Sequence, residues 1–407
     1  MEKSGRLKWL IEMLIYTVFG LYVFMTCFCN TAWYSFGEGS SLNTFLKIVR
    51  YICYGLFLLS AVYKIRQKHY SIEAMIYFSS LLLFSCIGMF TGKDNSLFLT
   101  ILFYMFLFGM SSNRLVKYAF IAQGLLLSLT IICAFAGLAD NSLLDPVRMR
   151  YSLGFNWSNL GPILYLFVSS EYIYIRKNKI TAIECVVMEI INVFLFKLTD
   201  TKMSFAILSV GLVLVFVCTV SDSFKSYVKK ILNKFYKGIL LLPIIGAFLA
   251  CWLPLYNSNS KVWMTLNYIL SGRLWQCKNA IVEYGFSLFG RYIPVEVYSV
   301  LNGGNSDQTY FIDSGYLHFA MKYGIFIIIL LVALYVLSLW KAYKKKDYYM
   351  IGIYIMLSVF CINDIHLISA FNIFTIYVFC DEDLFRHVSV LKKISNWINI
   401  HLLKKVA

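Results

Sequence analysis

The chain consists mainly of apolar stretches about as long as a membrane-spanning helix, separated by short polar segments. Hydrophobic residues make up 60% of the 407 positions and charged residues only 14%, too little charge to cover a soluble protein of this size. A spanning helix needs roughly 20 apolar residues. We therefore expect an all-α polytopic membrane protein with about 12 transmembrane helices. The predicted spans are 9–28, 44–63, 72–90, 97–111, 116–137, 160–175, 180–197, 203–220, 237–254, 314–340, 348–363 and 366–381.

Positive charge alternates from loop to loop along this arrangement. With the N-terminus in the cytoplasm, the inward-facing segments hold 25 of the 37 lysines and arginines, as the positive-inside rule requires. Orientation in a membrane therefore accounts for most of the basic charge, and nucleic acid is not an expected partner. We predict a multi-pass protein with both termini in the cytoplasm.

The span pattern also predicts how the chain is divided. We expect one transmembrane domain over residues 1–407, in which residues 255–313 form a large external loop subdomain containing short helices. The tail at residues 385–407 alternates apolar residues with Lys and His, a pattern typical of an amphipathic helix on the cytoplasmic membrane surface.

Twelve cations do not follow the orientation rule. Most of them fall in three outward-facing segments, at 138–159, 197–203 and 255–313. Cations gathered on the face that normally has few of them suggest an anion bound there. The alternative is that they are scattered exceptions of the kind that most membrane proteins contain.

The first two segments contain good phosphate ligands. Arg148 and Arg150 precede Asn159 at the predicted start of a helix, where forked guanidinium donors and free backbone N–H groups suit an oxyanion. Lys202 follows in a tight polar break between two spans. A helix cap with two interfacial arginines is the alternative reading of the first segment.

The third segment predicts a short helix that begins with a cation. Ser271 is a plausible N-cap and Gly285 a plausible stop, which places Arg273 in the first turn, where the helix dipole disfavours positive charge. This placement suggests a ligand role for Arg273, although a salt bridge to Glu283 or Glu296 would also explain it.

Two titratable residues near the next predicted span are candidate proton acceptors. Asp313 lies at its mouth and is either a general base or the N-cap of that helix. His318, one turn further on, is a reserve base or a core histidine. Ionisable residues within predicted spans should face the bundle interior, and they keep a transporter open as an alternative. They are Glu12, Glu171, Glu184, Glu189, Asp364 and His366.

Four motifs in order along residues 148–325 resemble the bacterial polysaccharide repeat-unit polymerases, the Wzy family within the O-antigen ligase and polymerase superfamily. Many Gram-positive members have the patterns R-x-S-L-G-F-x-H-P-N, T-x-S-R-x-S, S-G-R and D-N-x-Y with a later Y-G. This chain has Arg150-Tyr-Ser-Leu-Gly-Phe with Asn159-Leu-Gly, then Thr199-Asp-Thr-Lys-Met-Ser, then Ser271-Gly-Arg273 with Trp275 and Phe289-Gly290, and finally Asp313-Ser-Gly-Tyr316 with Tyr323-Gly324. It departs from the patterns at Trp157 and Ser158, where His-Pro is usual, at Lys202 for Arg and at Ser314 for Asn.

The resemblance implies a GT-C-like fold in a bacterial plasma membrane. It also implies a glycosyltransferase that moves a growing glycan from undecaprenyl pyrophosphate onto a lipid-linked repeat unit at the outer membrane face, for capsule, exopolysaccharide or O-antigen synthesis. The implied partners are these lipid-linked oligosaccharides, membrane lipid, a flippase and a chain-length regulator. We expect no cofactor and no metal. The predicted catalytic residues are Asp313, Arg273 and His318, and the predicted pyrophosphate and substrate ligands are Arg148, Arg150, Asn159, Lys202, Arg291, Trp275 and Tyr316.

Two other functions remain open at this point. An O-antigen-type ligase would share the donor chemistry and hand the glycan to a different acceptor. A flippase or permease for the lipid-linked glycan would place its charges along a central cavity rather than in one long loop.

Overall fold

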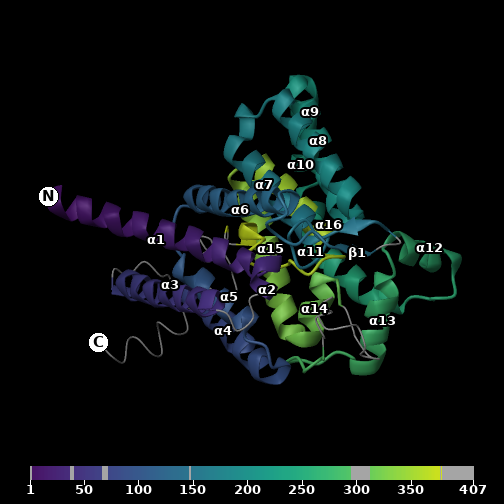
Figure 1. The fold of residues 1–407 in the computed structure, drawn as a ribbon, viewed down its shortest axis with the longest axis horizontal. Helices are drawn as coiled ribbons and strands as arrows, with labels where there is room; N and C mark the ends of the chain where they lie inside the picture. The colour runs from purple at the N-terminus through teal and green to yellow at the C-terminus, as the bar shows by residue number, and fades with distance from the viewer. Residues whose placement is uncertain are drawn as a thin grey trace.

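The structure is a computed structural model, and it describes residues 2–36, 41–66, 72–145, 148–294, 312–375 and 377. These residues form an all-α membrane protein with one short two-stranded ribbon (Figure 1). The predicted tail at 385–407 and the loop residues 295–311, including Glu296, lie outside the described residues.

The elements follow one another along the chain as helices joined by short connections. They are α1 (Glu2–Phe28), α2 (Ala32–Phe36), α3 (Ser41–Arg66), α4 (Ile72–Gly92), α5 (Ser96–Phe106), α6 (Ser112–Phe135), β1 (Leu143–Asp145), β2 (Arg150–Tyr151), α7 (Leu160–Arg176), η1 (Lys177–Lys179), α8 (Ala182–Thr199), α9 (Lys202–Val220), α10 (Asp222–Lys234), α11 (Tyr236–Trp252), η2 (Leu253–Leu255), α12 (Lys261–Ile269), α13 (Arg273–Tyr284), α14 (Gly315–Lys322), α15 (Ile325–Lys344), α16 (Tyr348–Phe360) and η4 (Ile373–Thr375).

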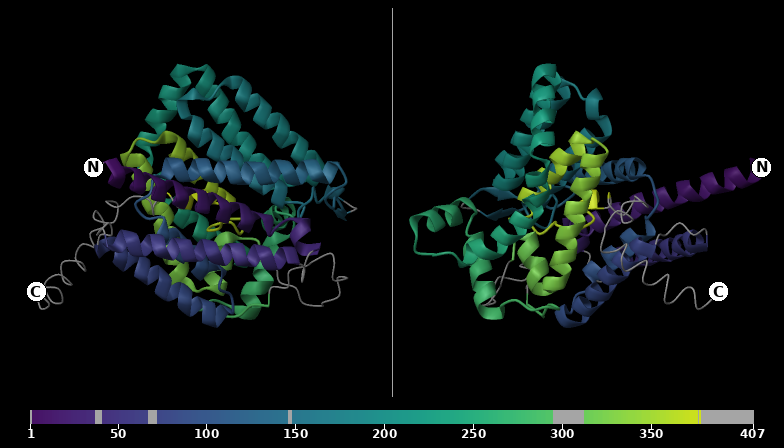
Figure 2. Two further views of the ribbon diagram at one scale, coloured as in Figure 1. Left: turned by 60° about the vertical axis from the view of Figure 1, so that its left-hand side comes forward. Right: turned by 180° about the vertical axis from the view of Figure 1, so that it is seen from behind.

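Six helices within the described residues are long and apolar enough to cross a membrane. They are Trp9–Phe28, Ile72–Gly92, Ser112–Phe135, Lys202–Val220, Tyr236–Leu255 and Ile325–Lys344. The long helices α1, α3 and α6 lie side by side, while α12 and α13 project on the side away from the N-terminus (Figure 2). The membrane class is therefore confirmed, and the count of twelve spans stays a prediction.

The tenth predicted span is interrupted. Residues 314–340 do not form one helix, because the chain breaks between α14 and α15 at Gly324, whose φ is +101°. The segment that follows α13 fills the break: the backbone N–H groups of Ile325 and Phe326 donate to the carbonyls of Ser287 and Leu288. Gly290 lies against the backbone of Lys322 and Tyr323. The Phe289-Gly290 and Tyr323-Gly324 motifs are thus two sides of one backbone contact.

Residues 366–372 of the twelfth predicted span, 366–381, are not helical, and the described residues that follow are the single turn η4 and the helical residue Tyr377. Between Cys361 and Thr375 the chain follows an irregular path that ends in the single turn η4. Irregular backbone is tolerated at membrane depth only where protein buries it and satisfies its polar groups. Side chains from α5, α6, α15 and α16 do so here: Tyr104, Gln123, Tyr335 and Tyr354 donate to its carbonyls. Residues 361–372 therefore form a loop that surrounding side chains support, although an apolar span was predicted from residue 366.

Helix α7 lies at the centre of the fold, and most of its residues are buried. Glu171 on this helix is completely buried, and its carboxylate has no hydrogen-bond partner among the described residues. Asp364 and His366 are buried as well, so the expected inward orientation holds for these three. Glu184 differs, because it forms a capping box with Thr181 at the start of α8 rather than lying within a span.

The long loop has a small core of its own beneath it. Helix α13 begins at Arg273, after Gly272 rather than after the predicted Ser271 cap, and ends at the predicted Gly285. Its buried face packs Cys277, Ala280 and Ile281 against Leu317 and Met321 of α14. Burial raises the pKa of the Cys277 thiol to about 12, so this cysteine is a core residue. The packing fixes the start of α13 close to the start of α14.

We predict that Gly324→Ala destabilises the protein by at least about 2 kcal/mol, because this backbone conformation strains any residue with a side chain. A Cβ atom here would also lie 2.4 Å from the Leu288 carbonyl oxygen. Thermal unfolding of the purified protein in detergent measures the effect. Gly238→Ala is the matched control, since Gly238 lies within α11 with nothing within 4 Å of its added Cβ, and equal stability of the two variants would contradict the prediction.

Candidate functional site

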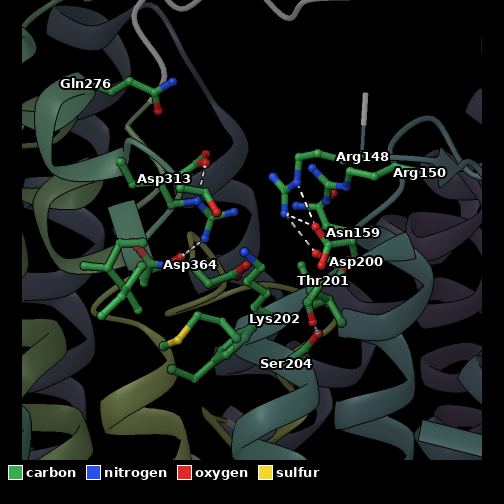
Figure 3. A pocket seen from close by; sticks show the side chains of 18 residues that line it. Arg148, Arg150, Asn159, Asp200, Thr201, Lys202, Ser204, Gln276, Asp313 and Asp364 are labelled. Carbon is green, nitrogen blue, oxygen red and sulfur yellow. Dashed lines mark hydrogen bonds and ion pairs between the residues drawn. The ribbon is translucent and has the colours of Figure 1, made fainter. Parts of the chain in front are cut away.

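A polar pocket of about 160 Å³ collects side chains from five segments that are far apart in the sequence (Figure 3). Its lining includes Arg148, Arg150, Asn159, Asp200, Thr201, Lys202, Ser204, Arg273, Gln276, Asp313, Asn363 and Asp364. Six predicted site residues thus share one hollow: Arg148, Arg150, Asn159, Lys202, Arg273 and Asp313. The volume lies below the 300 to 1,000 Å³ typical of drug-sized ligands. The pocket therefore suits a compact charged group better than a whole oligosaccharide.

The first turns of three helices line the pocket. Helix α7 begins after Asn159, α9 after Thr201 and α13 after Gly272, and none of these N-caps makes a side-chain capping bond. Helix N-termini carry partial positive charge and free N–H donors. Three of them at one hollow produce an electrostatic environment that favours an anion.

A short hairpin holds the two arginines of the first segment. Strand β2 pairs antiparallel with β1, with Arg150 opposite Asp145, and the Arg150 guanidinium donates to the Thr199 carbonyl at the end of α8. Arg148 forms an ion pair of 2.6 Å with Asp200. Gly154, with φ of +82°, packs against Thr130 of α6, where a Cβ would lie 2.8 Å from the threonine methyl. This contact explains the glycine in the Ser-Leu-Gly-Phe motif.

The backbone is strained beside the pocket. Met149, Asp200 and Ser271 are non-glycine residues with φ between +46° and +56°. Met149 lies between Arg148 and Arg150, and Asp200 and Ser271 each lie two residues before a cation of the lining, Lys202 and Arg273. Left-handed conformations cost such residues about 1 to 2 kcal/mol. Strain of this kind is often found where a fold must hold functional side chains in place.

The third arginine binds the predicted base. Arg273 Nε lies 2.9 Å from Asp313 Oδ2, and the same guanidinium donates to the Asn363 carbonyl. Asp313 does not cap the next helix, because Ser314 is the N-cap of α14 and accepts from the Leu317 N–H. The Asp313 carboxylate is therefore free of capping, and it pairs with Arg273 where Glu283 or Glu296 had been the alternative partners.

Asp313 is electrostatically suited to accept a proton. Burial raises the pKa of its carboxyl, with the neighbouring Asp364 charge acting in the same direction, while Arg273 and His366 oppose the rise. Its side chain still keeps 38% of its surface exposed, because the pocket opens onto it. A carboxylate with a raised pKa in contact with solvent or substrate is a better base than an ordinary surface aspartate.

Lys202 reaches into the space between the two sides of the pocket. Figure 3 shows Arg148, Arg150 and Asp200 on one side and Asp313 and Asp364 on the other, with Lys202 between them. Its ammonium group forms no hydrogen bond or ion pair within the part of the chain that the structure describes. The lining holds four cations and three carboxylates. Among the described residues, Arg148, Arg150 and Arg273 each have a hydrogen-bond or ion-pair partner, and Lys202 has none.

Asp364 and His366 belong to the site, although their sequence positions had placed them near the twelfth predicted span. Asp364 lines the pocket, and its Oδ1 accepts from the backbone N–H of His366 and lies 2.5 Å from His366 Nδ1. The N–H of Gly315 donates to the Asp364 carbonyl at 2.8 Å. The sequence signal for this pair is the Asp-x-His spacing at residues 364–366 within an apolar run. Only the irregular path of the segment brings Asp364 into the pocket with Asp313.

Four predicted site residues do not line the pocket. Arg291 is exposed and donates to the Tyr284 carbonyl, and Trp275 is exposed beside the ring of Trp263. Tyr316 is wholly buried, with its hydroxyl on the Ser358 carbonyl, so it has no face to stack on a sugar. His318 packs against Phe319 and Tyr323.

Other cations outside the orientation rule are held elsewhere. Lys322 forms an ion pair of 2.6 Å with Asp94, Lys278 donates to Ser258, and Lys93 lies over the ring of Tyr292. The anion hypothesis therefore narrows to the four cations of the pocket. Within the described ranges, no three His, Cys, Asp or Glu side chains are grouped as the ligands of a metal ion would be.

No protein family model, curated protein or solved structure matches this chain. The site must therefore be interpreted from its own geometry.

We predict that inorganic pyrophosphate stabilises the purified protein against heat, by about 2.7 kcal/mol at one hundred times its Kd. Arg273→Gln should weaken this binding about 30-fold or more, because Arg273 lies in the pocket lining and its loss leaves Asp313 unpaired. Arg291→Gln removes the same charge outside the pocket and should bind like the wild type. Equal loss in the two variants would show that net charge, rather than this pocket, binds the anion.

Proposed function

We propose that this protein is a membrane glycosyltransferase that polymerises oligosaccharide repeat units carried on undecaprenyl pyrophosphate. The observation that carries the proposal is the convergence of Arg148, Arg150, Lys202 and Arg273 on one small pocket beside a carboxylate with a raised pKa. Such a pocket fits a diphosphate leaving group with a proton acceptor next to it. The motif resemblance to the Wzy family supports the same assignment.

The arrangement of charge along α9 supports an external location for the pocket. Helix α9 begins at the pocket with Lys202 and ends before the basic helix α10. Its 19 residues span roughly 28 Å, about the hydrocarbon thickness of a bilayer. The positive-inside rule assigns the lysines of α10 to the cytoplasm, which puts the pocket at the opposite, outer surface, where lipid-linked repeat units are polymerised.

In the proposed reaction, an acceptor hydroxyl of one repeat unit attacks the anomeric carbon of the donor glycan. The new bond joins the acceptor oxygen to that carbon, and the bond between the carbon and the pyrophosphate oxygen breaks. Asp313 takes the proton of the hydroxyl. The arginines and Lys202 stabilise the charge that develops on the departing lipid pyrophosphate. Attachment to a carrier diphosphate supplies the free energy, so no nucleotide sugar is needed.

The ion pairs of the free pocket fit this cycle. Arg273 holds Asp313, and Arg148 holds Asp200, so each of these two arginines is neutralised by a carboxylate. A diphosphate competes with these carboxylates for the guanidinium groups. Binding of the donor then releases Asp313 toward the acceptor hydroxyl.

Polymerase activity can be measured with purified full-length protein in detergent and lipid-linked repeat units isolated from the cells of origin. We expect products that grow by one repeat unit at a time without an energy source. Arg273→Gln should slow chain growth at least about 100-fold, and cells carrying Arg273→Ala should display single repeat units. Transfer only to a foreign acceptor would indicate a ligase, and transbilayer movement without new linkages would indicate a flippase.

The pH dependence of the rate identifies the base. Asp313 acts in its charged form, so the rate should fall as the pH falls through its pKa. Asp364→Asn removes a neighbouring negative charge that raises this pKa, so the fall should move to lower pH. Asp313→Asn should instead lose about 10²- to 10⁴-fold of the rate. A loss of the same size in Asp364→Asn would assign the proton transfer to the Asp364–His366 pair.

A further inference from the structure

A second cavity, of about 510 Å³, lies between α7, α9, α10 and α16, toward the opposite end of α9 from the polar pocket. One part of its wall is apolar, with Val210 and Leu214 of α9 facing Ile353 and Met356 of α16. The volume falls in the range of sites for organic ligands of moderate size.

Lysines gather in another part of the lining of this cavity. They are Lys177, Lys225, Lys229, Lys345 and Lys346, and Asp347 is the single carboxylate that accompanies them. Lys177 uses that carboxylate in an ion pair of 2.7 Å. Among the described residues, Lys225, Lys229 and Lys346 form no ion pair, and Lys229 lies over the ring of Tyr348. This end of the cavity therefore has a net positive charge.

Helix α10 is built to face the cavity with one side and its surroundings with the other. Lys225, Val228, Lys229 and Leu232 line the cavity at helical spacing, and Asn233 ties the helix to α16 through the Tyr348 hydroxyl. Tyr227, Ile231 and Phe235 form an exposed stripe. Lys230 and Lys234 are also exposed and do not line the cavity. The helix therefore presents only two of its lysines to the cavity.

The combination of these walls selects the ligand class. A small inorganic anion would leave the apolar wall without a partner, and a neutral lipid would leave Lys225, Lys229 and Lys346 without an anionic partner. An amphiphile with a negatively charged head satisfies both, because lysines near a membrane surface attract anionic headgroups, and acyl chains fit between apolar helices. The amphipathic α10 is of the kind that lies at a membrane interface.

We propose that this cavity binds one anionic glycerophospholipid of the cytoplasmic leaflet. Its phosphodiester lies near Lys225, Lys229 and the Lys345–Lys346 turn, and an acyl chain follows the apolar wall between α9 and α16. The bound lipid joins α10 to the turn between α15 and α16. This binding site is independent of the polar pocket and does not rest on the proposed polymerase activity.

The test uses full-length protein in a neutral detergent, titrated with phosphatidylglycerol and, separately, with phosphatidylcholine of the same acyl chains. Native mass spectrometry counts bound lipid, and thermal unfolding measures stabilisation. We expect one phosphatidylglycerol to bind, and at least about tenfold weaker binding of phosphatidylcholine. The double variant Lys225→Gln/Lys229→Gln should lose about tenfold or more of the phosphatidylglycerol affinity.

The control variant Lys230→Gln/Lys234→Gln removes the same charge from the exposed side of the same helix and should bind normally. Gly352→Leu tests the apolar part without changing charge: Gly352 lines the cavity with nothing within 4 Å of an added Cβ, so a larger side chain should occupy the space and weaken binding. Equal weakening in both lysine variants, or equal binding of the two lipids, overturns the proposal. Stronger binding of undecaprenyl phosphate than of phosphatidylglycerol overturns the assignment to a glycerophospholipid.

Discussion

A charge without a partner is costly away from water, by several kcal/mol in a membrane protein, and this cost determines how the polar pocket is built. Arg273 is bound to Asp313, Arg148 to Asp200, and Arg150 to the Thr199 carbonyl. These contacts join the long loop, the first hairpin and the end of α8 around one hollow. In the proposed function a diphosphate replaces these same pairs, so the proposal links the stability of the pocket to ligand binding.

The same requirement explains the irregular segment after α16. Tyrosine and glutamine side chains from the surrounding helices donate to its carbonyl groups, and Asn372 within the segment donates to the His366 carbonyl. Because these donors hold the segment in place without a helix, Asn363 and Asp364 line the same pocket as Arg273 and Asp313.

Glycine positions complete the framework. Gly315 packs against the carbonyls of Asp364 and Cys361, where a Cβ would come within 2.7 Å, so the start of α14 and the irregular segment are held at backbone distance. Gly290 and Gly324 make a comparable contact at the other end of α14. These close approaches fix α14, and with it Asp313, between the loop and the helix bundle.

The sequence by itself determined the membrane class and a short helix with Arg273 in its first turn. It also singled out twelve cations that break the predicted orientation rule, four of which line the pocket. Composition, charge alternation and capping residues are local signals, and local signals suffice for these features. Only the tertiary structure decided which cations share a pocket, that Ser314 rather than Asp313 caps α14, that Tyr316 and His318 pack away from the site, and that Asp364 and His366 join it. The shared pocket and the burial of Tyr316 depend on contacts between residues 40 or more positions apart, such as Arg273 with Asp313 and Tyr316 with Ser358. An apolar stretch in sequence does not reveal whether its backbone is satisfied within a helix or by distant side chains.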